Sequence, residues 1–191
     1  YTSTASCSTG GQVNCSNYEL TNATKTYTIT PRVVTITAKD ASKIYDETPL
    51  TNSNCEMTGH VDGHTATCTM TSASTITEVG SVANTIDTVI IKSGTTDVTN
   101  NYSITKIAGT LTVNKANSVC PILTPYSGAY DGSAHGITVT GASGGTIQYR
   151  TSTTETWSNT KPTITNVGSI TTYVQVLGDG NHNTVDCGSK T

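Results

Sequence analysis

The pattern that most resembles a chemically active site consists of two cysteines and two histidines. Cys55, His60, His64 and Cys68 have the spacing Cys-x4-His-x3-His-x3-Cys. Thiolate and imidazole ligands can hold a zinc ion in a tetrahedral site. The alternative is a disulfide between the two cysteines, with the histidines exposed in the turn between them. The even number of cysteines favours the disulfide.

A second candidate site contains the single tryptophan of the chain. Trp157 and Tyr149 could form an aromatic platform that binds a ligand. The alternative is a packing role, because a tryptophan in a β-sandwich commonly fills the space between its two sheets. The packing role is the favoured interpretation.

Catalytic and nucleic-acid-binding chemistry are not indicated. Residues 179–181 (Asp-Gly-Asn) could offer oxygen ligands to calcium, but no distal glutamate completes a calcium loop, and these residue types are typical of turns. The four histidines are scattered, and no phosphate-binding loop occurs. The ten Lys and Arg residues are spread along a chain of net charge −3, which argues against nucleic acid. We therefore expect no enzyme, no catalytic or metal site, no cofactor and no nucleic-acid partner.

The six cysteines favour an oxidising location. They allow fifteen pairings, among which the sequence does not choose. Their order suggests three sequential bridges, Cys7–Cys15 in a short loop, Cys55–Cys68 across a hairpin and Cys120–Cys187 across the last segment. Disulfides predict a location outside the cytoplasm. No apolar run approaches the ~20 residues of a membrane span. The start at Tyr1, without Met or an apolar leader, predicts a mature or excised fragment.

The composition favours β-structure with small cores. The chain has no Phe, and about a fifth of it is Thr. Val, Ile, Leu and Tyr can line small cores, while Thr suits the outer face of a strand. Strand patterns recur between turn residues at 33–38, 84–92 and 104–113, and helical periodicity is not seen over ten residues. The sequence predicts an all-β chain.

Internal repeats predict two copies of one unit. Residues 45–47 (Tyr-Asp-Glu) match 130–132 (Tyr-Asp-Gly), and residues 79–81 match 167–169, both Val-Gly-Ser. An Asn-rich turn follows in each copy. A repeat at this period is typical of tandem modules, here with a boundary near residues 114–116.

The first thirty residues repeat the end of the first copy. Residues 17–21 match 101–105, and residues 26–29 (Thr-Tyr-Thr-Ile) match 110–113 (Thr-Leu-Thr-Val). The second copy, in contrast, stops at Thr191, before an equivalent last strand. We therefore expect a spare closing strand at the N-terminus and a missing one at the C-terminus. The residues of this possible assembly strand are Tyr18, Leu20, Tyr27 and Ile29.

Several of these motifs occur in one order. Between Val33 and Ala116 they are Tyr-Asp-Glu (45–47), Gly-His-Val-Asp-Gly-His (59–64), Val-Gly-Ser (79–81), Asn-Thr-Ile (84–86) and Gly-Thr-Leu-Thr-Val (109–113). The segment resembles the bacterial MBG/YDG-type repeats. The motifs at 130–136 and 145–149, with Trp157, resemble their sister repeat. The resemblance implies Ig-like spacers of secreted, adhesin-like surface proteins, without known catalytic residues. Six cysteines are not part of the usual pattern.

These observations give one main expectation and two alternatives. The fold is expected to be all-β, with tandem immunoglobulin-like β-sandwiches at 31–116 and 117–191, and closing or donor strands at 1–30. The function expected is an extracellular, non-catalytic stalk or spacer of a bacterial surface or fibre protein, its partners being neighbouring repeats. One alternative is a filament subunit joined head-to-tail to identical subunits by its donated N-terminal strand. The other is an adhesin module that binds a host glycan or protein.

Overall fold

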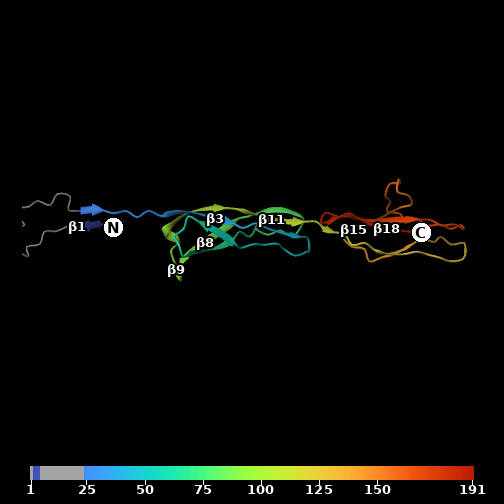
Figure 1. Ribbon diagram of the computed structural model, residues 1–191, viewed down its shortest axis with the longest axis horizontal. Coiled ribbons are helices and arrows are strands. Elements are labelled where there is room, and N and C mark those ends of the chain that lie inside the picture. Colours follow the sequence, from blue (N-terminus) through green and yellow to red (C-terminus); the bar gives the residue numbers. More distant parts are fainter. Residues whose placement is uncertain (1, 5–23) are drawn as a thin grey trace, which may run out of the picture.

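The computed structural model describes residues 2–4 and 24–191 and shows an elongated all-β chain (Figure 1). Within these residues no helix has the length and apolar character needed to cross a bilayer. The elements are β1 (Thr2–Thr4), β2 (Thr24–Thr26), β3 (Arg32–Ala38), β4 (Ala41–Ile44), β5 (Cys55–Thr58), β6 (His64–Met70), β7 (Gly80–Asn84), β8 (Ile86–Ser93), β9 (Thr96–Asp97), the 3-10 turn η2 (Thr99–Asn101), β10 (Tyr102–Ile107), β11 (Gly109–Asn114), β12 (Ala116–Asn117), β13 (Ile122–Thr124), β14 (Thr138–Thr140), β15 (Gly145–Arg150), β16 (Thr172–Gly178), β17 (His182–Asn183) and β18 (Val185–Lys190).

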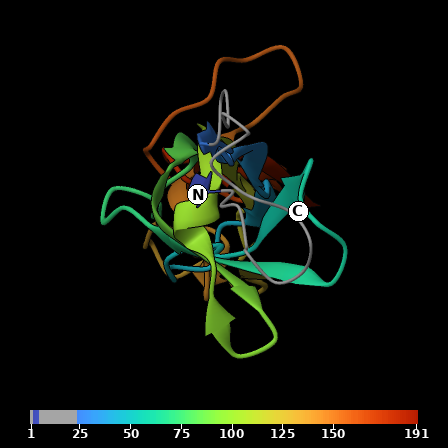
Figure 2. The same cartoon turned by 90° about the vertical axis from the view of Figure 1, so that its left-hand side faces the viewer.

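The strands after β2 form two groups that follow one another along the long axis of the molecule (Figure 1). We call β3–β11 the first unit and β12–β18 the second unit. The ladders of the first unit have the orders β10-β3-β5, β4-β11-β7 and β6-β8-β9. Those of the second unit are β12-β17, β13-β14 and β15-β16-β18. Viewed along the long axis, the units form a narrow body from which a few loops project (Figure 2).

The first two strands of the first unit, β3 and β4, run side by side with its last two, β10 and β11, in the same direction. β3 pairs in parallel with β10, and β4 pairs in parallel with β11. Both ladders keep one register, in which partners such as Ala41 and Leu111 are 70 residues apart. Between the two ladders, the backbone N–H of Thr110 donates to Asp40 Oδ1 at 2.7 Å. At this point Gly109 lies so close to Ala38 O that a Cβ would stand 2.6 Å from it. The close approach of β10–β11 to β3–β4 therefore requires glycine at position 109.

Alternating burial along the strands builds the small core that the composition predicts. In β3 the side chains of Val34, Ile36 and Ala38 are buried, and in β11 those of Leu111 and Val113 are buried, while the residues between them are more exposed. This period of two places one face of each strand inside.

The Cys55–Cys68 disulfide joins two different ladders, so the expectation that it would clamp a hairpin is wrong. β5 pairs with β3, and β6 pairs with β8. The turn at Gly63 does reverse the chain, with a φ of 81°. The two strands it connects then separate into different sheets, because each extends the hydrogen bonding of another strand.

The second unit has a separate core. Ile137, Tyr149 and Val174 are buried together, with Leu123 and Cys187 packed against them. The antiparallel ladders β15–β16 and β16–β18 form its main sheet.

Two turns with related sequences have the same geometry in the two units. Asp46 Oδ1 accepts the backbone N–H of Thr48 at 3.0 Å, and Asp131 Oδ1 accepts that of Ser133 at 2.8 Å. Such Asx turns need a side-chain acceptor two residues before the donor. The pKa of Asp46 is lowered to about 2, chiefly by its hydrogen bond with Lys43.

The segments after these turns form matching bridges. Leu50 pairs with Ile76 in the first unit, and His135 pairs with Ile164 in the second. The segments after the two Asx turns are therefore equivalent in structure as well as in sequence.

The buried strand β11 supplies the first test. Leu111 is fully buried and its backbone pairs with both β4 and β7. We expect Leu111→Ala to lower the free energy of unfolding by about 2–5 kcal/mol, the usual range for a leucine truncated in a core. Urea denaturation followed by circular dichroism would measure it. The adjacent exposed Thr110→Ala should change stability by less than about 0.5 kcal/mol. Equal effects would contradict the assigned core.

Candidate functional site

The residues of the possible zinc pattern form a structural link. Cys55 and Cys68 are joined in a disulfide with a Cα–Cα distance of 6.2 Å. His64 Nδ1 lies 2.6 Å from the hydroxyl of Tyr102, and the two rings meet edge to face. No group of three metal-ligating side chains occurs in the described part of the chain. The residues thus connect the β5 and β6 strands and position a core tyrosine.

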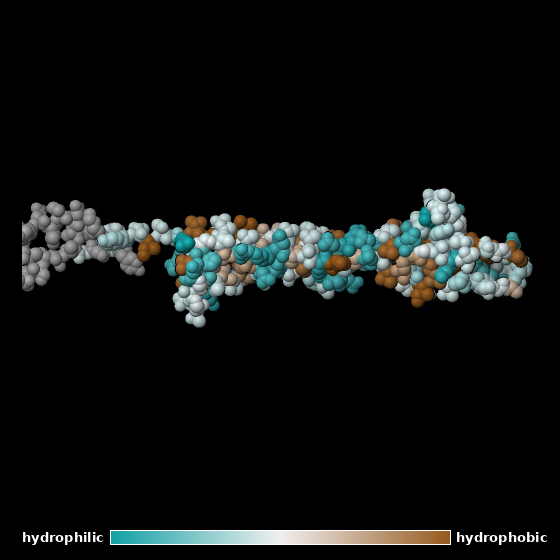
Figure 3. All heavy atoms as spheres, viewed as in Figure 1, coloured by the Kyte–Doolittle hydropathy of each residue, from teal (hydrophilic) through white to brown (hydrophobic). Residues whose placement is uncertain are grey.

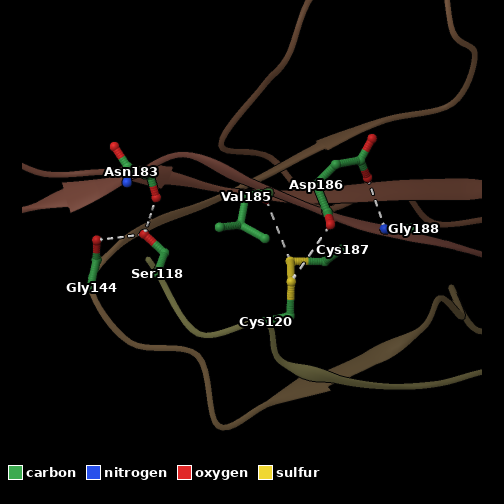
Figure 4. The surroundings of a disulfide bond; sticks show 8 residues. All are labelled: Ser118, Cys120, Gly144, Asn183, Val185, Asp186, Cys187 and Gly188. Atoms are coloured by element: carbon green, nitrogen blue, oxygen red, sulfur yellow. Dashed lines mark hydrogen bonds between the residues drawn. A yellow bond between two sulfur atoms is a disulfide. The ribbon is translucent and has the colours of Figure 1, made fainter. Parts of the chain in front are cut away.

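The Cys120–Cys187 disulfide holds together the first and last segments of the second unit (Figure 4). The Cα–Cα distance is 5.4 Å. Nearby, Ser118 Oγ lies 2.9 Å from Gly144 O and 2.8 Å from Asn183 O. β12 and β17 form only a short parallel ladder, so the disulfide continues the connection beyond it. Both bridges match the pairs that cysteine order suggested, whereas Cys7 and Cys15 lie outside the described residues.

The turn considered for calcium is satisfied by its own residues. Asp179 Oδ1 accepts the backbone N–H of Asn181 at 2.8 Å and lies 2.7 Å from His182 Nδ1. The hydrogen bond with His182 is the largest cause that lowers the pKa of Asp179. The carboxylate therefore orients a turn, as the residue types alone indicate.

This turn is also the contact point between the two units. Asn181 Nδ2 donates to the carboxylate of Glu78, and the backbone N–H of Val79 donates to Asn181 Oδ1 at 3.0 Å. The rings of Tyr45 and His182 meet edge to face, with centroids 5.4 Å apart. We call this set the junction.

The connecting residues are bound to the second unit. Lys115 Nζ donates to the carbonyl oxygens of Asp179 and His182, at 3.0 and 3.2 Å. The backbone N–H of Ala116 donates to Asn181 O at 3.0 Å. The link between the units is thus part of the junction.

A groove lies at the opposite end of the second unit. It has a volume of about 660 Å³ and lies between residues 125–131 and 164–170. The rings of Tyr126 and His135 stack within it at 3.8 Å. Apolar side chains reach the surface in this part of the molecule (Figure 3), and Val167 at the rim is 91% exposed.

Trp157 and Tyr149 do not form one exposed platform. Tyr149 is 9% exposed and belongs to the core, where burial raises its pKa. The guanidinium of Arg150 covers the ring of Trp157 at 4.3 Å. It also lies 5.7 Å from the ring of Tyr173. The pair therefore lacks the open face that a glycan platform needs.

The predicted assembly strand is described only in part. Tyr18 and Leu20 lie outside the described residues. Tyr27 is 61% exposed and Ile29 is 81% exposed. These residues follow β2, which pairs with β1 in an antiparallel ladder.

One string that fits a catalytic pattern has no catalytic geometry. Residues 141–145 (Gly-Ala-Ser-Gly-Gly) fit Gly-x-Ser-x-Gly, which in hydrolases forms a sharp turn from strand to helix. Here Ser143 forms a backbone bridge with Val119, and strand β15 follows. The string is a turn between strands.

The strand order, the parallel first and last strands and the Asx turns describe one compact β-module over residues 32–114. Residues 34–112 match the family model of the MBG domain (YGX type). The match is consistent with an MBG-type repeat, and we call this segment the MBG repeat. MBG domains are non-catalytic modules of surface proteins. No curated protein and no solved structure matched the chain.

The sequence pointed to the MBG repeat but not to the junction. Glu78 and Asn181 come from segments far apart in the chain, and no local pattern indicates that they bond. A signal did exist: Tyr45 and Val79 occupy repeated motifs, with Tyr130 and Val167 as their counterparts. Tyr45 and Val79 both lie at the junction.

The two disulfides should differ in their effect on stability. The sequence separations are 13 and 67 residues. In the chain-entropy treatment these closed loops correspond to about 3 and about 4.5 kcal/mol. We expect Cys120→Ala/Cys187→Ala to lower the free energy of unfolding more than Cys55→Ala/Cys68→Ala. Urea denaturation of both double variants would measure the difference, and the reverse order would contradict the loop argument.

The junction should lose rigidity without losing folded structure when Asn181 is truncated. Asn181→Ala removes both side-chain hydrogen bonds to the MBG repeat but keeps the backbone bonds of the turn. We expect a broader distribution of angles between the units in residual dipolar couplings, with little change in melting temperature. Glu78→Gln, which keeps an acceptor oxygen, is the matched control. Unchanged couplings in Asn181→Ala would show that other contacts fix the angle.

Proposed function

We propose that the chain is a non-catalytic stalk or spacer segment of an extracellular bacterial surface or fibre protein. The observation that carries the proposal is the junction. The MBG repeat and the second unit are connected by hydrogen bonds of Asn181 and by a contact between two rings. The linker between the units is also bound, through Lys115. A connection of this kind favours a fixed axis, which a spacer needs and a flexible linker lacks.

The domain organisation that we propose has an immunoglobulin-like repeat at 31–116, a second at 117–191 and closing or donor strands at 1–30. The matched Asx turns and the matched bridges of the two units support the repeat assignment. The disulfide between two ladders in the first unit is a feature shared with immunoglobulin-type sandwiches.

The extracellular location rests on two observations of different kinds. MBG domains are modules of surface proteins, and disulfides persist in oxidising environments. A protein outside the cell also gains from covalent links, because no chaperone restores an unfolded module there. An adhesin role has less support, since Tyr149 is buried and Trp157 is covered by Arg150.

The spacer role predicts how far the chain holds an attached epitope from a surface. We expect the chain, displayed between a membrane anchor and a terminal epitope, to make that epitope accessible to a large antibody. A Gly/Ser linker of equal length is the control, because it samples many collapsed conformations. Flow cytometry with a full antibody and with a small nanobody measures the difference. Equal antibody access with both spacers would argue against the stalk function.

A further inference from the structure

A loop of the second unit is longer than its counterpart in the MBG repeat. β6 pairs with β8 as β15 pairs with β16, so β6 and β15 correspond. Residues 71–75 connect the end of β6 to the bridge at Ile76, whereas residues 151–163 connect the end of β15 to the equivalent bridge at Ile164. This longer loop, in orange, projects from the body of the molecule (Figures 1 and 2). The MBG repeat is complete without such a loop, so the added residues are available for another task.

The start of this loop positions an arginine on the outer face of the main sheet. Burial alternates along the end of β15, where Tyr149 faces the core and Arg150 faces outward. The guanidinium of Arg150 lies 4.3 Å from the ring centroid of Trp157 in the loop and 5.7 Å from that of Tyr173 in β16. Aromatic rings attract a cation to their faces. The two rings therefore hold the guanidinium in one place.

The charge of Arg150 has no anionic partner among the described residues, whose ion pairs all involve lysine or histidine. Arg150 Nη1 donates to Thr153 O at 3.0 Å, while its Nε is buried and has no acceptor. A guanidinium has five N–H donors, and a charge partly removed from water is costly without a partner. A carboxylate fits this need, because its two oxygens match the planar fork of arginine.

A row of amides lies beside Arg150 on the same face. Gln148 precedes Arg150 by two residues, so both side chains lie on one side of β15. Gln175 Nε2 donates to Gln148 Oε1 at 2.8 Å, and Gln148 Nε2 donates to Asn159 Oδ1 at 3.1 Å. These bonds fix the orientation of the Asn159 amide, whose Nδ2 donates to no described residue and whose side chain is exposed. The row thus ends in an oriented donor that suits a hydroxyl group.

Acidic side chains nearby limit the number of charges that a ligand can carry. Glu155 lies in the loop, where its carboxylate accepts the backbone N–H and the hydroxyl of Thr151 at 2.8 and 2.6 Å. Asp186 lies in β18, opposite Gln175. Because like charges repel, these carboxylates disfavour a polyanion such as an acidic peptide. A ligand with one carboxylate among neutral groups is the better match.

We propose that this outer face binds a carboxylated sugar within an otherwise neutral glycan. The carboxylate pairs with the guanidinium of Arg150, and a ring hydroxyl accepts a hydrogen bond from Asn159 Nδ2. The cover of Trp157 by Arg150 prevents the stacking of a neutral sugar and places a positive charge there instead. The proposal adds a binding site on the side of the spacer, and it does not depend on the spacer function.

The single tryptophan of the chain reports on this site. Trp157 contacts Arg150, so a ligand bound there changes the fluorescence of the indole. We expect the purified chain to show a saturable change in emission with 3′-sialyllactose or with glucuronyl-xylotriose, which carry a sialic acid and a uronic acid. Neutral lactose and xylotriose should cause no change. The acidic glycan that responds identifies the type of sugar.

Two variants test the residues of the site. Arg150→Gln removes the charge and should weaken binding by about tenfold or more in isothermal titration calorimetry. Because this change also releases Trp157, Asn159→Asp is the second variant, which keeps an oxygen for Gln148 Nε2 and adds a charge that repels the carboxylate. It should weaken binding by a similar factor with an unchanged melting temperature. Asn100→Asp, which adds the same charge to an exposed residue of the MBG repeat, should bind like the wild type.

Three results would overturn the proposal. They are a wild type that binds neither acidic glycan, a wild type that responds equally to the neutral sugars, and an Asn159→Asp variant that binds like the wild type. A glutamate-rich peptide that binds as tightly as the glycans would overturn the assignment to a sugar. The spacer function is unaffected by any of these results, because it is tested by epitope access.

Discussion

The burial of Leu111 and Val113 between β4 and β7 is the interaction on which the rest of the structure depends. The chain has no phenylalanine, so each core consists mainly of a few aliphatic side chains, with one buried tyrosine in each. A core of this size is completed only when the last strand returns beside the first. The parallel register of these strands, with Gly109 at the crossing, then determines where the chain leaves the MBG repeat. The position of the following unit depends on that exit.

The second unit solves the same problem with covalent chemistry. Its first and last segments pair over only two positions before β18 joins β16 instead. Cys120 and Cys187 connect these segments where backbone pairing stops. The disulfide thus stands where the first unit has a continuous parallel ladder. The first unit joins its first and last segments by backbone hydrogen bonds, and the second adds a disulfide to a short ladder.

Much of this arrangement could be read from the sequence because it depends on local patterns. Residue type and spacing predict the alternating burial in β3 and β11. They also predict the two described cysteine pairs and the repeated motifs at Tyr45 and Tyr130. The parallel pairing of β3 with β10 could not be predicted from the sequence, because alternation shows which face of a strand is buried and not which strand is its neighbour.

The same limit applies to the candidate site. The contact of Asn181 with Glu78 and Val79 joins residues about a hundred positions apart, and nothing in either segment alone indicates it. The separation of β5 and β6 into different ladders was missed for a related reason. A turn at Gly63 shows that the chain reverses, but the partner of each strand is set by competition across the whole module.

The parallel pairing of the terminal strands has a consequence for load. A pull along the molecule enters the MBG repeat at the start of β3 and leaves it at the end of β11. β3 pairs in parallel with β10, which leads into β11, and β4, which follows β3, pairs in parallel with β11. The tension therefore acts on both ladders in shear, along the strand direction, and the bonds of each ladder share it. An antiparallel hairpin pulled at its open ends would instead separate one bond at a time. The module is built to be stretched from its two ends.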